Sequence, residues 1–323
     1  FVAVGGMVAV LISEPPVVAG WEAGGLRIGI AGLLVALFVG LIYALRRFVS
    51  AAWIKNWGTA ALLVAAYFII RPVFEGGVTA VESIAAASAG NLGGLGLNIL
   101  VSWGVAAVVC IGVAWVIGRI ALGLRADYLA IATLGISEII IAVMKNEDWL
   151  SRGVKNVIGL PRPVPYEIEL QESAGFIERT TALGLDPVTS SSIVVKLGYA
   201  SLFSIVLVIV LVLAQLALAS PWGRMMRAIR DNEEAAEAMG KNVTARHLQI
   251  FILGSAICGV AGAMMTTLDS QLTPSSYQPL RFTFLVWVMV IVGGSGNNFG
   301  SVLGGFLIFF LWVQVEPMGA ILM

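Results

Sequence analysis

The sequence predicts an all-α membrane protein that crosses the bilayer about nine times. Of its 323 residues, 59% are hydrophobic and only 12% are charged, whereas a soluble domain is typically about 45–50% apolar. Apolar runs recur that are long enough to cross a bilayer, which takes about 17–25 helical residues. The charge is concentrated between these runs. A water-soluble fold is thereby excluded.

Nine apolar segments account for the predicted helices. They are residues 1–12, 28–45, 57–70, 99–118, 128–144, 197–219, 248–268 and the two halves of 282–315. The uncharged stretch 282–315 is too long for one crossing, and its glycine-rich centre, Gly293–Asn298, predicts a tight turn between two short helices. Because Phe1 lies inside an apolar run, we expect residues 1–12 to be the visible part of a first helix. Because the ninth helix ends outside, we expect a further helix after it.

The distribution of Lys and Arg predicts the orientation of these helices. Short cytoplasmic loops of membrane proteins carry an excess of basic residues. Nine spans place the loops 46–56, 119–127 and 220–247 on one side, with ten basic residues, against three in the opposite short loops. The first set is therefore predicted to be cytoplasmic, and segment 145–196 is predicted to be an ordered external loop region with short helices.

Loop 220–247 holds the densest charge in the sequence, five basic and four acidic residues. It predicts one helix from about Trp222 to Met239, with Pro221 in the first turn and Gly240 ending it in the left-handed conformation. Four residues at helical spacing form a narrow apolar stripe, namely Met225, Ile229, Ala236 and Met239. Such a helix suits a groove on a partner protein; the alternative is a solvated or membrane-surface connector.

Two further local signals support helices in and after this loop. Pairs of opposite charge at i,i+4 spacing stabilise helices, and the loop contains two of them, Arg227 with Asp231 and Arg230 with Glu234. Asn242 or Thr244 is predicted to cap the helix that follows.

Three blocks of sequence resemble a known family. EAAEAMG, from Glu234 to Gly240, has the E-A-A-x-x-x-G spacing of the cytoplasmic loop of ABC importer permeases, although Ile252 and Leu253 replace the usual Leu-Pro after it. The wider likeness lies in Leu124–Ile140, Gly223–Met264 and Val290–Ile308. In these blocks the chain resembles the M-type permeases of branched-chain amino acid ABC importers, closely over 97–323 and weakly before it.

The resemblance implies a function without bond chemistry. The chain would be a single transmembrane permease domain, 1–323, in the inner (plasma) membrane, moving leucine, isoleucine or valine inward. Its implied partners are a second homologous permease subunit, two ABC ATPase subunits and a periplasmic substrate-binding protein. ATP hydrolysis would belong to the ATPase subunits, so the chain itself is not expected to be an enzyme.

The resemblance also makes loop 220–247 the ATPase-coupling loop. The residues expected to carry this role are Arg224, Arg227, Arg230, Glu234, Ala235, Ala236, Met239 and Gly240. The two alanines would allow close approach to the ATPase subunit, and the charged residues would fix the register through contacts at the rim.

Segment 128–144 supplies the candidates for the translocation pathway. Glu138 is an ionisable residue inside a span, and such residues usually face the bundle interior or water. Glu138 either shapes the permeation path or lies near the outer interface, where its carboxylate would form hydrogen bonds with neighbouring helices. Three small residues share this segment, Thr133, Gly135 and Ser137, and permit either close helix packing or a lined path. Asp127, behind Arg125, is predicted to cap the helix.

Several kinds of site are not predicted. No G-x-x-x-x-G-K-[ST] motif occurs, so no P-loop for ATP is expected. Cys110 and Cys258 lie in separate predicted helices, and His247 is the single histidine, which argues against a zinc site. Neither a metal, another cofactor nor a nucleic-acid partner is expected.

Two alternatives remain open on sequence alone. Relatives of this branch carry urea, short amides or other amino acids, and selectivity belongs largely to the binding protein. An ion-coupled secondary transporter is the other class, but such proteins usually show several intramembrane charges or broken helices, whereas Glu138 is nearly alone.

Segment 145–196 also has two possible roles. It is equally a landing surface for the binding protein or a plain lid over the helix ends.

Overall fold

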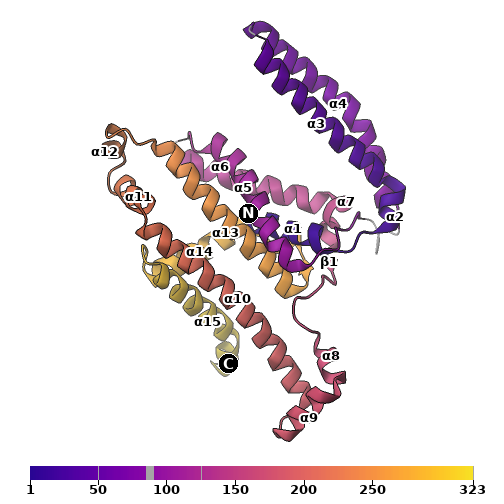
Figure 1. Ribbon diagram of the computed structural model, residues 1–323, viewed down its shortest axis with the longest axis vertical. Helices are drawn as coiled ribbons and strands as arrows, with labels where there is room; N and C mark the ends of the chain where they lie inside the picture. Colours follow the sequence, from indigo (N-terminus) through magenta and orange to yellow (C-terminus); the bar gives the residue numbers. More distant parts are fainter. Residues whose placement is uncertain (50, 85–90, 125, 323) are drawn as a thin grey trace.

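The computed structural model describes residues 1–49, 51–84, 91–124 and 126–322 (Figure 1). Arg125 and the side chain of Asp127 lie outside this description, as do residues 85–90 of a predicted external loop. The first half of the chain contains α1 (Val2–Ser13), α2 (Val18–Gly20), η1 (Trp21–Gly25), α3 (Leu26–Phe48), α4 (Ala52–Glu82), α5 (Ile99–Ala121), α6 (Ala126–Asn146), α7 (Asp148–Ser151), η2 (Gly153–Lys155) and β1 (Val157–Ile158). The second half contains α8 (Glu167–Glu172), α9 (Ala174–Ala182), α10 (Pro187–Ala219), α11 (Pro221–Asp231), α12 (Glu233–Ala238), α13 (Val243–Asp269), β2 (Gln271–Leu272), η3 (Pro274–Ser276), α14 (Pro279–Gly293) and α15 (Asn298–Leu322).

The described chain is an all-α membrane protein, as predicted. Seven helices are long and apolar enough to cross a membrane, and α1 and α14 are shorter apolar helices. Together they correspond to the nine predicted segments. The turn between α14 and α15 is also confirmed, with Gly294 at φ 94°.

Two helices are longer than the hydrophobic segments that predicted them. α4 continues through Pro72 to Glu82, and α10 begins at Pro187, ten residues before the predicted start. α10 begins there because the Asp186 side chain accepts the backbone N–H of Thr189 at 2.8 Å, which caps the helix. Loops 71–98 and 145–196 are therefore shorter than expected.

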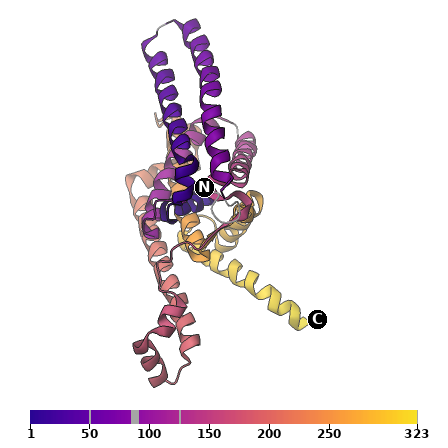
Figure 2. The same cartoon turned by 90° about the vertical axis from the view of Figure 1, so that its right-hand side faces the viewer.

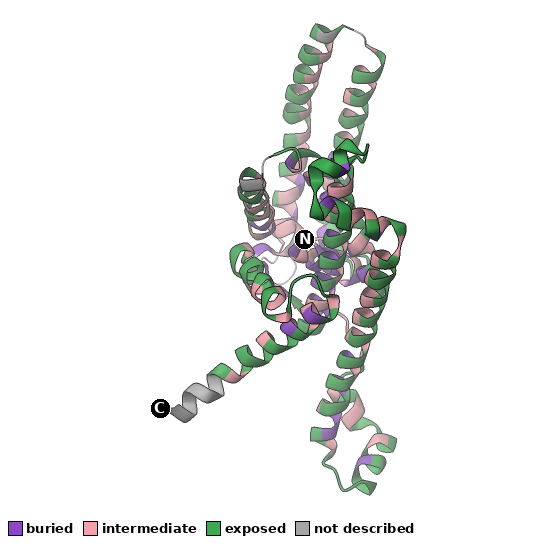
Figure 3. Ribbon diagram, turned by 90° about the vertical axis from the view of Figure 1, so that its left-hand side faces the viewer, coloured by how far each residue is buried: buried purple, intermediate pink, exposed green. Residues whose placement is uncertain are grey.

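Three helices, α1, α5 and α13, form the centre of the molecule. A Cβ atom on Gly5 would overlap the carbonyl group of Gly259, and one on Gly259 would overlap Cys110. Glycine thus allows the backbones of α1 and α13 to approach closely, as small residues do between membrane helices. Buried residues gather in this centre, while the α3–α4 hairpin is mostly exposed (Figure 3).

The two ends of α10 carry different structures. α11 and α12 follow one end, and the α8–α9 hairpin lies at the other (Figures 1 and 2). Loop 220–247 and the α8–α9 hairpin therefore lie at opposite ends of α10, and the side of the membrane that each faces stays a prediction. In Figure 2 the α3–α4 hairpin and the α8–α9 hairpin protrude in opposite directions.

A two-stranded sheet connects segment 145–196 to the end of α13. Val157 pairs with Leu272 and Ile158 with Gln271 in antiparallel register. Beside the sheet, the Arg162 Nε atom donates a hydrogen bond to the Ser270 hydroxyl at 2.9 Å. α13 therefore connects the loop 220–247 directly to this sheet.

A buried polar contact lies at the end of α1. Asn91 is only 1% exposed, and its Nδ2 atom donates to the two carboxylate oxygens of Glu14 at 3.2 and 3.3 Å. Burial raises the pKa of the Glu14 carboxyl group above its ordinary value, and the bond from Asn91 and the charge of Arg152 oppose this shift.

Candidate functional site

The predicted coupling loop contains two helices instead of one. α11 ends at Asp231 and α12 begins at Glu233, with Asn232 between them in an extended conformation. The Asn232 side chain accepts the backbone N–H of Ala235 at 2.9 Å, which is the usual cap at a helix start. The prediction of one continuous helix was wrong, because the asparagine that interrupts the apolar stripe begins a second helix.

The apolar stripe of this loop is mostly buried within the loop itself. Ile229, Ala236 and Val243 form a buried cluster, and Met225 packs against it. α12 contacts both α11 and α13, so the break at Asn232 folds the stripe inward. Ala236 is only 8% exposed. It therefore belongs to the core of the loop and not to an outer contact surface, contrary to the prediction.

The arginines of α11 are engaged with their own chain. Arg224 and Arg227 donate to two of the last carbonyl oxygens of α10 at 3.3 and 3.4 Å, which lack partners within that helix. Arg230 pairs with the adjacent Asp231 at 2.9 Å. Neither predicted i,i+4 ion pair forms in this part of the described chain.

α12 and the turn after it form an exposed part of the loop surface. Met239 is 81% exposed, and the exposed residues around it are Glu233, Glu234, Ala235, Glu237 and Gly240. Gly240 has φ 76°, which confirms its predicted left-handed conformation. The Asn242 side chain then accepts the N–H of Ala245 at 2.9 Å and caps α13, also as predicted.

A cavity of about 750 Å³ lies between α6 and α14, with further walls from α1 and α5. We call it the α6–α14 cavity. The side of α6 contributes Thr133 and Ser137, and the side of α14 contributes Leu280, Phe284 and Trp287. None of the described residues that line it is charged.

The four pathway candidates on α6 face two different ways. Thr133 and Ser137 line the α6–α14 cavity, so in the described chain they border an open space. Gly135 and Glu138 are exposed on the outside of the subunit, and neither belongs to the cavity wall. The four residues therefore do not border one space within this subunit.

The family model for the permease component of branched-chain amino acid transport systems matches residues 57–318. This range includes both the loop 220–247 and most of the α6–α14 cavity. The chain belongs to this family. Membership agrees with the predicted resemblance and with a multi-pass protein of the inner membrane. The matched range begins after α3, so α1, α2 and α3 lie outside it.

The relatives of this permease include transporters with different cargoes. It is 28% identical over 218 residues to the high-affinity branched-chain amino acid permease LivM of Salmonella typhimurium, covering 66% of this chain and 50% of that protein. A probable LivM of Methanocaldococcus jannaschii is 33% identical over 85 residues, covering 26% and 25%. The fructose import permease FrcC of Rhizobium meliloti is 28% identical over 102 residues, covering 30% and 28%.

The permease spans about half the length of the LivM relative from Salmonella. No solved structure shows significant similarity to it. Membership of the family thus rests on the family model over residues 57–318, while the activity and the partners of the whole protein are matters for proposal.

A polar junction in this permease connects α11 to α13. The Gln249 side-chain oxygen accepts hydrogen bonds from Trp222 Nε1 at 3.1 Å and from Arg246 at 2.9 Å. Sequence reasoning missed Gln249. The available signal was a polar residue in the first turns of an apolar helix, directly after the charged loop.

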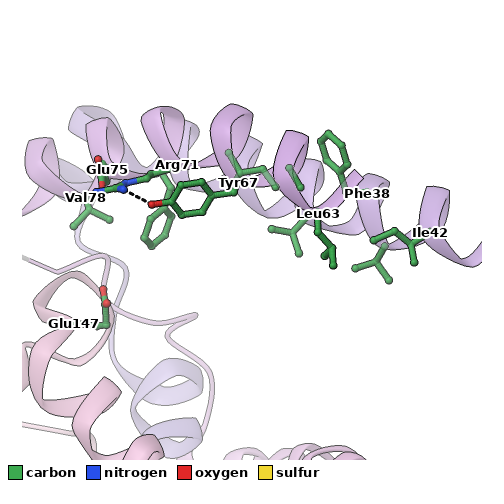
Figure 4. A pocket seen from close by; sticks show the side chains of 13 residues that line it. Phe38, Ile42, Leu63, Tyr67, Arg71, Glu75, Val78 and Glu147 are labelled. Atoms are coloured by element: carbon green, nitrogen blue, oxygen red, sulfur yellow. Dashed lines mark hydrogen bonds and ion pairs between the residues drawn. The ribbon is translucent and has the colours of Figure 1, made fainter. Parts of the chain in front are cut away.

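Besides the α6–α14 cavity, a groove of about 760 Å³ runs along the α3–α4 hairpin (Figure 4). It is mainly apolar, and Arg71 forms an ion pair with Glu75 at 2.6 Å and a hydrogen bond with the Tyr67 hydroxyl. Both polar contacts join successive turns of α4. The charge of Arg71 is thus compensated within its own helix.

Proposed function

We propose that the chain is an inner-membrane permease subunit of an ABC importer that moves leucine, isoleucine and valine into the cytoplasm. The observation that carries the proposal is the family match over residues 57–318. The folded module at 220–247, outside the apolar spans, supports it because an importer of this class needs a contact with its ATPase subunits. The remaining proposed partners are a second permease subunit and a periplasmic binding protein.

The contact with an ATPase subunit is assigned to α12 and the turn after it. The apolar stripe and the arginines of α11 are occupied within the chain, which leaves Met239 as the exposed apolar side chain of α12 and its following turn. Three exposed carboxylates surround it, those of Glu233, Glu234 and Glu237. The complementary partner surface is an apolar socket with basic residues at its rim, since opposite charges at a rim orient the encounter.

The landing surface of the binding protein is assigned to the α8–α9 hairpin. This hairpin projects from the far end of α10 (Figure 2). Its exposed charges are the carboxylates of Glu169, Glu172 and Glu178 and the single cation of Arg179. A binding protein with a basic surface would complement this acidic hairpin.

Glu138 is assigned to the contact between the two permease subunits. It is exposed on α6, and a carboxylate that faces lipid at the centre of a span costs about 2.5–3.5 kcal/mol or more. A second subunit would cover it and place it beside a path between the subunits. Glu138→Gln should then lower leucine uptake; unchanged uptake and unchanged subunit association would contradict this role.

The test of the proposed function is uptake by the reconstituted complex. The permease is purified in complex with its ATPase subunits and its partner permease, placed in proteoliposomes and supplied with the cognate binding protein. We expect ATP-dependent uptake of labelled leucine, isoleucine and valine. Uptake of fructose or urea instead would overturn the cargo assignment, and uptake without ATP would overturn the ABC mechanism.

A further inference from the structure

The α8–α9 hairpin depends on a few contacts for its orientation. Of the residues described in α8 and α9, Thr180 alone is buried. The hairpin packs mainly against α10 and projects from the far end of that helix (Figure 2). Because so little apolar surface is buried within the hairpin, its own core contributes little to holding it in place. Its orientation must therefore come from specific contacts with the rest of the chain.

A proline-rich segment connects the hairpin to the two-stranded sheet. Residues 161–165 read Pro-Arg-Pro-Val-Pro and lead directly to Tyr166 at the start of α8. Proline has a fixed φ and no backbone N–H, so the segment is stiff and offers few backbone hydrogen bonds. Side chains must therefore fix its direction. Val164 does so in part, because it packs beside Gly198 of α10, where a Cβ atom would come within 2.9 Å of Val164 Cγ1.

Arg162 supplies the polar anchor of this segment. Its Nε atom donates to the Ser270 hydroxyl at 2.9 Å, and its Nη1 atom forms an ion pair with the Glu167 carboxylate at 3.1 Å. Its guanidinium group also lies over the Tyr166 ring, 5.1 Å from the centroid. A planar guanidinium group with several donors suits such simultaneous contacts. Arg162 thus connects the end of α13 with the first residue of α8.

The acceptor of this anchor is itself held firmly. Ser270 adopts a left-handed conformation with φ 52°, and its carbonyl oxygen accepts the backbone N–H groups of Gly159 and Leu160 at 3.1 and 3.2 Å. Leu160 belongs to a buried cluster with residues of α1 and α6. A second polar contact attaches α8 to α10, since Gln171 Nε2 donates to the buried Ser191 hydroxyl at 2.8 Å. The base of the hairpin is therefore attached to two different long helices.

We propose that Arg162 is a positioning residue, which holds the α8–α9 hairpin in the orientation in which the binding protein docks. This inference rests on the proposed function, in which the hairpin is the landing surface. A preoriented surface binds more tightly than a mobile one, because less conformational freedom is lost on association. Loss of the contact between Arg162 and Ser270 should therefore weaken docking and leave the later steps of transport unchanged.

The first test measures the orientation of the hairpin without the binding protein. In a complex free of other cysteines, spin labels are attached to Ile158→Cys in β1 and to Leu183→Cys directly after α9, two exposed positions. Arg162→Gln should widen the distribution of distances between the labels at least twofold. The control Lys196→Gln removes an exposed cation of α10 and should leave the distribution unchanged. An unchanged distribution with Arg162→Gln would overturn the inference.

The second test separates docking from transport. Arg162→Gln removes the anchor, and Ser270→Ala removes its acceptor without changing any charge. Both should raise the binding-protein concentration that gives half-maximal leucine uptake at least fivefold, while maximal uptake stays close to that of the wild type. The control Ser201→Ala removes an exposed hydroxyl of α10 and should change neither value.

The outcomes distinguish the anchor from the proposed function. Wild-type half-maximal concentrations in both variants, or a loss of maximal uptake alone, would overturn the inference. If the wild-type complex takes up no leucine with ATP and the binding protein, the proposed function itself fails. The distance measurement does not depend on uptake and reports on the anchor separately.

Discussion

At the scale of single residues, burial distinguishes two adjacent alanines of the charged loop. Ala236 lies at helical spacing from Ile229 and was predicted to face a partner, yet it is buried between α11 and α13. Its neighbour Ala235 is exposed. The two alanines therefore have different roles although they are adjacent and chemically identical.

Because Ala236 is buried and Ala235 is exposed, the same substitution to arginine should have different effects at the two positions. Ala236→Arg forces a long charged side chain into a packed cluster, and overpacking alone typically costs about 1–3 kcal/mol. We expect faster amide hydrogen exchange throughout 220–247. Ala235→Arg should leave exchange unchanged and weaken ATPase binding instead. Equal exchange rates in the two variants would contradict the burial of Ala236.

The raised pKa of Glu14 predicts a pH-dependent contribution to stability. Because burial favours the protonated carboxyl group in the folded protein, the folded state binds more protons than the unfolded state, and stability falls as pH rises through the two pKa values. Glu14→Gln keeps an acceptor for Asn91 without the charge. At pH 7.5 we expect the Glu14→Gln variant to have a higher melting temperature than the wild type. Below about pH 4, where the wild-type carboxyl group is protonated, the two melting temperatures should be the same.

The control for this comparison is Glu172→Gln, which changes an exposed carboxylate of α8. Its melting temperature should follow that of the wild type at both pH values. A gain for Glu14→Gln that persists at low pH would show that charge burial is not its cause.

At the scale of elements, α12 is the part of the loop that remains available to a partner. It is a six-residue helix, held from inside by the cluster of Ile229, Ala236 and Val243 and capped by Asn232. Gly240 turns the chain immediately after it. A short helix fixed at both ends presents Met239 in a defined place.

Met239 is expected to anchor the contact with the ATPase subunit. Met239→Asp replaces the apolar group by a charge among carboxylates, and we expect a loss of at least tenfold in ATPase affinity. Met239→Leu conserves the apolar volume and should retain binding and transport. The measurement is co-purification of the ATPase subunits together with leucine uptake. Wild-type coupling in Met239→Asp would assign the contact to another part of the loop.

At the scale of the whole molecule, α13 runs from the loop at 220–247 to the two-stranded sheet. Its first turns bond to α11 through Gln249, and its end continues into the sheet with β1 and the contact between Arg162 and Ser270. One continuous helix thus connects the loop at 220–247 to the sheet of β1 and β2.

The binding protein is expected to contact the α8–α9 hairpin of this subunit. α8 and α9 project beyond the helix bundle (Figure 2), whereas the alternative external segment 73–98 is helical to Glu82 and hydrogen-bonded to the end of α1 through Leu95 and Leu97. Photo-cross-linkers at Glu172 and Glu178 should therefore capture the binding protein. Cross-links confined to 73–84 or to the partner permease would count against this assignment.

The sequence by itself determined the membrane-spanning helices and the ends of several of them. A run of about 20 apolar residues forms a helix in a bilayer because its backbone groups have no other partners there. The caps at Asn242 and the left-handed turn at Gly240 are likewise local, since the side chain or the missing Cβ acts on its own backbone. These features appeared in the structure as predicted.

Only the tertiary structure decided which surfaces of these helices remain free. An apolar stripe such as that of Met225, Ile229 and Ala236 has the same pattern whether it packs against its own chain or against another protein. The path of the chain at Asn232 turns this stripe inward. Likewise, Thr133 and Glu138 are five residues apart on one helix, and the positions of α5 and α14 place the first in a cavity and leave the second exposed. Local sequence carries no information on those distant positions, which depend on packing between helices far apart in the chain.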